Sequence, residues 1–181
     1  MLILIIGGAA SGKSELAEGI CVRLSKSRKA YIATMAVCDD ESAGRVAKHR
    51  EMRKDKGFST VEHSMCGQYR RSEFSGCDTA LLECVSNLLA NEMYMAGESA
   101  CAAETKIAEY VGRLAEDVKH AVIVSNDIFA AAGDYDAFTR EYISALGNIN
   151  RRLAETADEV IESVCGIPVY LKGRLSSVGP V

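Results

Sequence analysis

Residues 2–16 read LILIIGGAASGKSEL, and this stretch decides the fold. The apolar run 2–6 is typical of a central parallel strand that is buried on both faces. From Lys13 to Leu24 apolar side chains recur at helical spacing, so a helix is expected directly after the strand. Between them lies GGAASGKS (7–14), a complete G-x-x-x-x-G-K-[S/T] pattern in the strand–turn–helix context that this motif requires.

This glycine-rich turn predicts a binding site for the phosphates of ATP or GTP. Glycines let the backbone fold tightly and aim its N–H groups at phosphate oxygens, and the helix adds the positive end of its dipole. We expect Lys13 to reach the outer phosphates and Ser14 to help hold Mg²⁺ through its hydroxyl. An unliganded turn is the alternative, against which the strand and helix argue. The predicted nucleotide-binding residues are Gly7, Gly8, Ala9, Ala10, Ser11, Gly12, Lys13 and Ser14.

An acidic residue at the end of a neighbouring strand should complete the magnesium site. Glu83, which follows the apolar residues of TALLEC (79–84), is the first candidate, either as a direct ligand or through water. Asp127, after AVIVSN (121–126), is the second. Each could instead be a polar residue that only ends a strand.

Apolar runs alternate with helical patterns along the rest of the chain. This alternation predicts an α/β fold of the P-loop NTPase type, with a mostly parallel sheet covered by helices on both faces. No linker divides the chain, so we expect one nucleotide-binding domain over residues 1–181. Segment 63–76 is polar and irregular and receives no assignment. The expected strands are 2–6, 30–34, 59–62, 79–84, 121–125, 159–164 and 168–171, and the expected helices are 13–24, 40–56, 85–95, 105–119 and 137–156.

Composition excludes several other classes of protein. A formal net charge of −4 and no long basic run argue against nucleic acid as a partner. No stretch approaches the ~20 apolar residues of a membrane span, and the apolar opening has no basic flank, so a cytoplasmic protein is expected. The seven cysteines form no C-x-x-C pair and indicate buried or incidental thiols, not a zinc site.

One of the three histidines, His49, lies in a basic block, ESAGRVAKHREMRK (41–54). Neighbouring positive charges favour neutral imidazole, which is a competent nucleophile toward phosphorus. A solvated histidine on a charged helix is the alternative. His63 and His120 are expected to be structural or exposed.

Several segments together resemble a known family. The chain is similar along its length to the bifunctional adenosylcobinamide kinase/adenosylcobinamide-phosphate guanylyltransferases of cobalamin biosynthesis. The segments that carry the resemblance are GGAASGKS (7–14), YIAT (31–34), DDE (39–41) with RVAKHR (45–50), TVE (60–62), LLEC with the following NLL (81–89), VIVSN (122–126), NRRLAETADEV (150–160) and GIPVYLK (166–172).

The resemblance implies a two-step chemistry. A nucleoside triphosphate would phosphorylate the aminopropanol hydroxyl of adenosylcobinamide, and GMP from GTP would then pass through a guanylyl-histidine to the phosphate, which gives adenosylcobinamide-GDP. His49 would be that histidine, with Lys13 as the second catalytic residue. Glu62 would join Glu83 among the nucleotide-binding residues, and Arg45 and Arg50 are candidates to hold phosphate. A homotrimer with sites near the subunit contacts is implied as well.

The chain departs from the family pattern in one region. SNDIFAAAGDYD (125–136) replaces a Thr-Asn-Glu-Val-Gly segment and the Gly-Ile-Val-Pro that follows it, and Ile143 and Ser144 replace an Arg-Asp pair. Phe58 stands where a tryptophan is expected. Two other functions therefore stay open: a P-loop kinase of another small alcohol, and a nucleotide-gated binding module without transfer activity.

Overall fold

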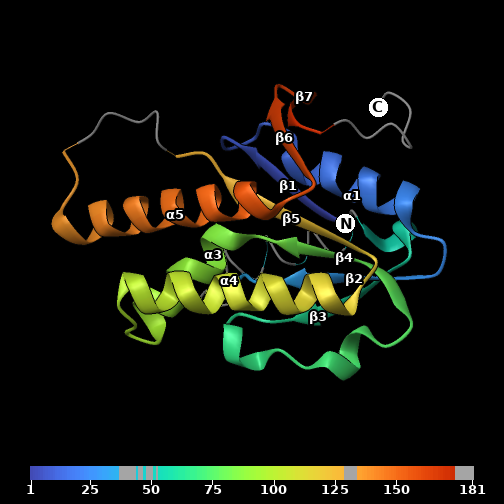
Figure 1. Cartoon of the computed structure of the whole chain (residues 1–181), viewed down its shortest axis with the longest axis horizontal. Helices are drawn as coiled ribbons and strands as arrows, with labels where there is room; N and C mark the ends of the chain where they lie inside the picture. Colours follow the sequence, from blue (N-terminus) through green and yellow to red (C-terminus); the bar gives the residue numbers. More distant parts are fainter. Residues whose placement is uncertain (37–43, 45–46, 48–50, 52, 129–133, 174–181) are drawn as a thin grey trace.

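A seven-stranded sheet forms the centre of the molecule (Figure 1), with the strand order β3-β2-β4-β5-β1-β6-β7. The structure, a computed structural model, describes residues 1–36, 44, 47, 51, 53–128 and 134–173. Every neighbouring pair is parallel except β6 and β7. The strands are β1 (Leu2–Gly7), β2 (Arg28–Ala33), β3 (Phe58–Glu62), β4 (Cys77–Glu83), β5 (His120–Asn126), β6 (Glu159–Val164) and β7 (Ile167–Lys172).

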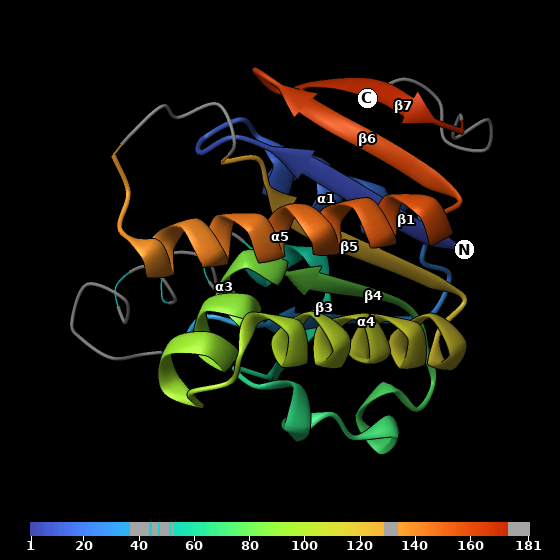
Figure 2. The same ribbon diagram turned by 60° about the vertical axis from the view of Figure 1, so that its left-hand side comes forward.

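Helices cover both faces of this sheet, as the alternating sequence pattern predicts. In Figure 2, α4 (Ala100–Asp117) and α5 (Ala137–Thr156) lie in front of the strands, and α1 (Lys13–Leu24) lies behind them. The short helix α3 (Val85–Ala90) packs on the same face as α4 and α5. The predicted class, a mostly parallel α/β fold with helices on both faces, is confirmed.

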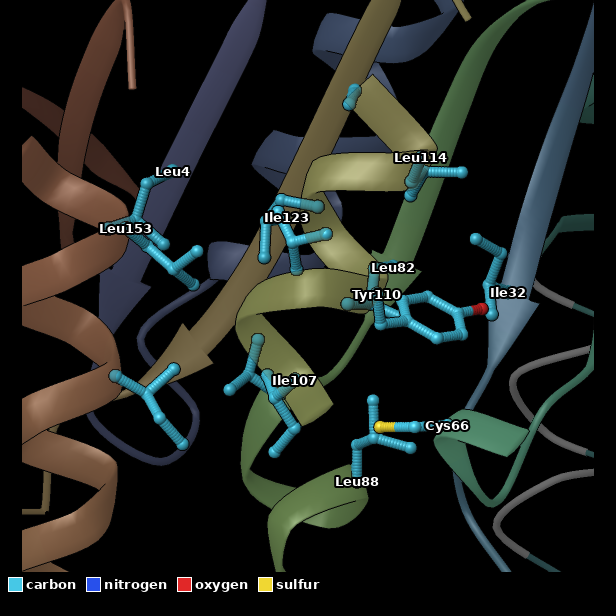
Figure 3. Close-up of a cluster of buried hydrophobic side chains, with 14 of the residues drawn as sticks. Leu4, Ile32, Cys66, Leu82, Leu88, Ile107, Tyr110, Leu114, Ile123 and Leu153 are labelled. Atoms are coloured by element: carbon cyan, nitrogen blue, oxygen red, sulfur yellow. The ribbon is translucent and has the colours of Figure 1, made fainter. Parts of the chain in front are cut away.

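The central strands divide their apolar side chains between the two faces. Leu4, Leu82 and Ile123 point toward α4 and α5, where they meet Ile107 and Leu153 in the larger core (Figure 3). Their neighbours in sequence point the other way and pack against α1: Ile3, Ile5, Leu81, Val122 and Val124. Because both faces are buried, these strands read as continuous apolar runs instead of alternating ones.

Segment 63–76, which the sequence pattern leaves unassigned, forms two 3₁₀ helices, Cys66–Gln68 and Arg71–Phe74. Contacts distant in sequence hold it against α4. His63 is buried, with its Nδ1 2.6 Å from the Tyr110 hydroxyl and its Nε2 2.8 Å from a Glu73 carboxylate oxygen. The Tyr69 hydroxyl donates to Asp117 Oδ2 at 2.7 Å. His63 therefore has a structural role, one of the two outcomes expected for it.

The remaining element boundaries differ modestly from expectation. Helix α4 begins at Ala100, five residues before the expected start at Thr105, because the Ser99 hydroxyl accepts a hydrogen bond from Ala102 N–H and caps it. The helix after β4 passes into a π-helical turn over Asn91–Met95. Of the expected surface helix 40–56, only residues 44, 47, 51 and 53–56 are described; the first four are helical and Lys54–Lys56 form a 3₁₀ helix. Within the described part of the chain, no helix is long and apolar enough to cross a membrane.

The carboxyl ends of the parallel strands lie at one edge of the sheet. The arrowheads of β1, β4 and β5 point toward this edge, on the left in Figure 2. The turn 8–12 follows β1 at this edge, and Asn126 of β5 pairs with Gly7 of β1. In open parallel sheets, ligands bind outside the carboxyl ends of the strands, so this edge is where a functional site is expected.

Candidate functional site

The turn between β1 and α1 has the geometry of a phosphate-binding loop. Lys13 is the first residue of α1, and its side-chain Nζ donates a hydrogen bond to Gly8 O at 2.9 Å. Lys13 is only 8% exposed, so its charge is directed over the loop instead of into solvent. A helix N-terminus beside a lysine in this position is a ready site for phosphate groups.

Two glycines of the loop are required by close backbone approaches. The Ser11 carbonyl accepts hydrogen bonds from Ser163 Oγ at 2.7 Å and from Gly166 N–H at 2.8 Å, which fastens the loop to the β6–β7 turn. A Cβ on Gly7 would lie 2.9 Å from Ser163 O, and a Cβ on Gly12 would lie 3.0 Å from Gly166 Cα. Gly12 also has φ +85°, a left-handed conformation that favours glycine.

The predicted metal-binding pair meets across the sheet edge. Glu83 ends β4, Ser14 lies in the first turn of α1, and Ser14 Oγ donates to Glu83 Oε1 at 2.8 Å. Burial raises the pKa of the Glu83 carboxyl to about 7, while the Ser14 hydrogen bond and the Lys13 charge act to lower it. With a pKa near neutrality, this poorly solvated side chain can be acid or carboxylate, and a cation beside it would favour the carboxylate.

These residues fit a magnesium ion. The second Glu83 oxygen, Oε2, is buried and has no hydrogen-bond partner. Mg²⁺ prefers oxygen ligands and usually takes one or two from the protein, the rest coming from phosphates and water. The described residues contain no group of three or more His, Cys, Asp or Glu side chains that could hold a metal alone. The Ser14 hydroxyl and Glu83 thus suit an ion that arrives with a nucleotide.

Thr34, at the end of β2, positions the turn that carries Glu83. Its N–H donates to Glu83 O at 3.0 Å, and its Oγ1 accepts from Cys84 N–H at 2.6 Å. The Asn91 side-chain amide donates to Thr34 O at 2.8 Å and ties this corner to the π-helical turn. Sequence reasoning missed this role, because it depends on β2 lying beside β4.

A buried cation, Arg53, lies on the same side of the sheet as α1. Its guanidinium stacks 3.4 Å from the centroid of the Tyr31 ring, it is 5% exposed, and its Nε has no hydrogen-bond partner. The sequence places Arg53 in the basic block, but it does not predict that this arginine stacks on Tyr31 of β2. Close by, Lys56 Nζ and Glu18 Oε2 form an ion pair at 2.5 Å.

The other predicted site residues are spread along the edge or lie outside the described part of the chain. Glu62 ends β3 and is exposed; Ala33 of β2 pairs with both Glu62 and Glu83, so the two glutamates lie two strands, or about 10 Å, apart. Asp127 follows β5, and its N–H donates to Gly7 O at 3.0 Å. His49, Arg45 and Arg50 lie outside the described residues, so their roles stay predictions.

An open pocket of about 490 Å³ borders the loop on the side of α5. We call it the lateral pocket. Ala9 of the loop, the residues directly after β5 and residues in the first turns of α5 line it. Its described lining residues are Ala9, Asp127, Ile128, Tyr135, Thr139, Tyr142 and Ile143.

The buried Glu83 carboxyl makes the stability of the metal-free protein depend on pH. Its pKa is about 7 in the folded chain against the ordinary value of 4.5, so the folded state binds the proton more tightly than the unfolded state. The free energy of unfolding should therefore fall as pH rises from about 4.5 to about 7. The whole shift corresponds to about 3 kcal/mol at about 1.4 kcal/mol per pKa unit.

Glu83→Gln should remove this dependence, since the amide does not ionise. The free energy of unfolding of the variant minus that of wild type should therefore increase by about 2 kcal/mol as the pH rises from 5 to 8. Urea unfolding in the presence of EDTA measures the difference at each pH. An equal difference from wild type at both pH values would contradict the assignment.

Comparisons with known proteins agree along almost the whole chain. The family model described as cobinamide kinase / cobinamide phosphate guanyltransferase matches residues 3–171. The bifunctional adenosylcobalamin biosynthesis protein CobU of Escherichia coli strain K12 is 29% identical over 185 residues, covering 95% of this chain and 100% of the relative. CobP of Pseudomonas aeruginosa, which bears the same description, is 30% identical over 172 residues, with 94% and 97% covered.

Solved structures share the fold at much lower sequence identity. The flagellar accessory protein FlaH of Methanocaldococcus jannaschii superposes with a TM-score of 0.54 at 13% identity, over 99% of this chain and 81% of that one. A KaiC-like protein of Pyrococcus horikoshii gives 0.55 at 10% identity, over 89% and 69%. These two indicate the fold alone. The family match covers the loop, the Ser14–Glu83 pair and the basic block together, and the chain belongs to the cobinamide kinase / cobinamide phosphate guanyltransferase family.

Proposed function

We propose that this protein phosphorylates the aminopropanol hydroxyl of adenosylcobinamide with a nucleoside triphosphate and then transfers GMP from GTP to the new phosphate. The product of the second reaction is adenosylcobinamide-GDP. The observation that carries this proposal is the assembled phosphate site: the loop, the shielded Lys13 and the Ser14–Glu83 pair occur together at the edge where parallel sheets bind ligands. The family to which the chain belongs supports the identity of the substrates.

In this proposal the loop and its lysine serve both reactions. The backbone N–H groups of residues 8–14 and the Lys13 ammonium would hold the phosphates of the nucleotide and stabilise the negative charge that develops on the departing group. Ser14 and Glu83 would hold Mg²⁺, which when bound offsets the charge of the phosphates. Glu62, at the end of β3, would contact the nucleotide farther from the loop.

His49 is proposed as the group that carries GMP. A neutral imidazole nitrogen would attack the α-phosphorus of GTP, a P–N bond would form, and the bond to pyrophosphate would break. An oxygen of the cobinamide phosphate would then attack the same phosphorus, and the P–N bond would break to release the imidazole. Arg45 and Arg50 would hold phosphate oxygens during these steps. The guanylyl-histidine intermediate thus divides one difficult displacement at phosphorus into two easier ones.

Two further properties are proposed. A cytoplasmic location is supported by the six free cysteines of the described chain, since unpaired thiols are typical of reducing compartments. A homotrimer is proposed from the family resemblance, with no nucleic acid among the partners.

The test is product analysis with adenosylcobinamide, GTP and Mg²⁺, followed over time by liquid chromatography and mass spectrometry. The phosphate should accumulate first and adenosylcobinamide-GDP should follow, with both lost when EDTA replaces Mg²⁺. The phosphate alone would mean a kinase without the second activity. Tight nucleotide binding without either product would mean a binding module and would overturn the proposal.

A further inference from the structure

Three aromatic side chains gather on the surface beside the lateral pocket. Tyr94 belongs to the π-helical turn, and Phe138 and Tyr142 belong to the first turns of α5. The Tyr94 ring lies 4.6 Å from Phe138 and 6.2 Å from Tyr142, measured between ring centroids. Tyr94 is 55% exposed and Phe138 is 40% exposed, so much of this group faces solvent. We call these three residues the aromatic shelf.

The aromatic shelf is continuous with the phosphate site. Tyr142 is both a member of the shelf and part of the lining of the lateral pocket, and Ala9, which also lines that pocket, belongs to the loop itself. The Tyr142 hydroxyl donates to Ser86 O at 3.1 Å, which fixes its ring on α3. A ligand lying on the shelf could therefore extend through the pocket to the phosphates without leaving the protein surface.

The lining of the pocket is apolar or uncharged apart from the Asp127 carboxyl group, and it favours a partly apolar ligand without negative charge. The described lining residues of the lateral pocket include no lysine, arginine or histidine, so they offer no cation for a phosphate group. Ile143 stands where the family pattern has arginine, and it lines this pocket. Single exposed apolar residues are ordinary on protein surfaces, but a contiguous group beside a site marks a ligand groove.

We propose that the aromatic shelf and the lateral pocket bind the corrinoid substrate, with the corrin macrocycle on Tyr94 and Phe138 and the aminopropanol arm in the pocket. This inference rests on the proposed function, which requires the arm's hydroxyl to reach the phosphates. The arm is short, so the macrocycle must lie next to the loop. Within the described part of the chain, the shelf is exposed aromatic surface that adjoins the loop through the pocket, and the neutral amides of the macrocycle require no basic residue.

The test compares Tyr94→Ala and Phe138→Ala with wild type in steady-state kinetics at saturating Mg·GTP. Each variant should raise the KM for adenosylcobinamide about tenfold, the size expected for a lost aromatic contact. The KM for GTP should not change. Both side chains are largely exposed, so the variants should fold, and circular dichroism checks this. Tyr170→Ala is the matched control: Tyr170 lies on β7, is 39% exposed, and its loss should change neither constant.

Equilibrium dialysis with adenosylcobinamide separates this inference from the proposed function. If wild type does not turn the corrinoid over, the proposed function fails, but wild type should still bind it more tightly than either shelf variant. Equal corrinoid binding by wild type and both variants would overturn the inference even in an active enzyme. A rise in the KM for GTP alone would overturn it as well, since it would mean that the shelf stacks a purine base.

Discussion

Lys13→Ala should lower kcat/KM for both phosphoryl transfer and GMP transfer by about a thousandfold. Lys13 is 8% exposed and lies at the start of α1 with its Nζ 2.9 Å from Gly8 O, where its charge acts in a poorly solvated place. Removing a preorganised positive group from such a position withdraws stabilisation that water cannot replace. The variant should fold, because alanine is the best helix former and the lost side chain is polar.

The two reactions are measured separately: formation of the corrinoid phosphate in the first, and conversion of supplied adenosylcobinamide phosphate and GTP to adenosylcobinamide-GDP in the second. Both should fall together, because the sequence contains one complete phosphate-binding motif, GGAASGKS (7–14). Lys29→Ala is the control, since Lys29 lies near the start of β2, at the opposite edge of the sheet. A variant that loses only one reaction would show that the second nucleotide binds elsewhere.

The elements that the sequence predicts best are those whose signals are local. The strand and helix around the loop and the helix over 137–156 have the predicted bounds within one residue. For α5 the start follows from its own cap, because Asp136 Oδ1 accepts from Thr139 N–H at 2.6 Å. Propensity, apolar spacing and capping agree at these places, so no distant contact is needed to fix them.

The parts that could not be predicted depend on residues distant in sequence. Segment 63–76 takes its shape from the contacts of His63 with Tyr110 and of Tyr69 with Asp117, which exist only after α4 has docked. The strand order was likewise not predicted. The sequence predicts that Ser14 and Glu83 act together. Without the strand order, it does not show that Thr34 binds the backbone next to Glu83.

The same distinction applies to the lateral pocket. Its lining comes from the loop and from the end of β5 with the first turns of α5, which follow the loop more than a hundred residues later in the sequence. The sequence identifies Ile143 as a departure from the family, and only the fold shows that the change places an apolar side chain in a pocket next to Ala9. The fold thus shows what the sequence position of Ile143 does not: the replacement of arginine by isoleucine makes this pocket more apolar.

His49→Ala should abolish the covalent GMP adduct while leaving phosphorylation of the corrinoid intact. The guanylyl intermediate needs a nitrogen nucleophile, whereas the kinase step uses the substrate's own hydroxyl. His49 itself lies outside the described residues. Intact-protein mass after incubation with Mg·GTP should show one added GMP on wild type and none on the variant. The adduct should be labile to acid, as expected of a phosphorus–nitrogen bond.

His120→Ala is the matched control for this experiment. His120 opens β5 at the edge of the sheet opposite the loop, and its pKa is lowered first by burial and then by the nearby N-terminal amino group. If a neutral imidazole alone were enough, His120 could carry the adduct, although it lies at the sheet edge opposite the loop. An adduct that survives His49→Ala, or one that disappears in His120→Ala, would reject His49 as the carrier. If His49→Ala loses the adduct but keeps its kinase activity, the two reactions share the loop but use different nucleophiles.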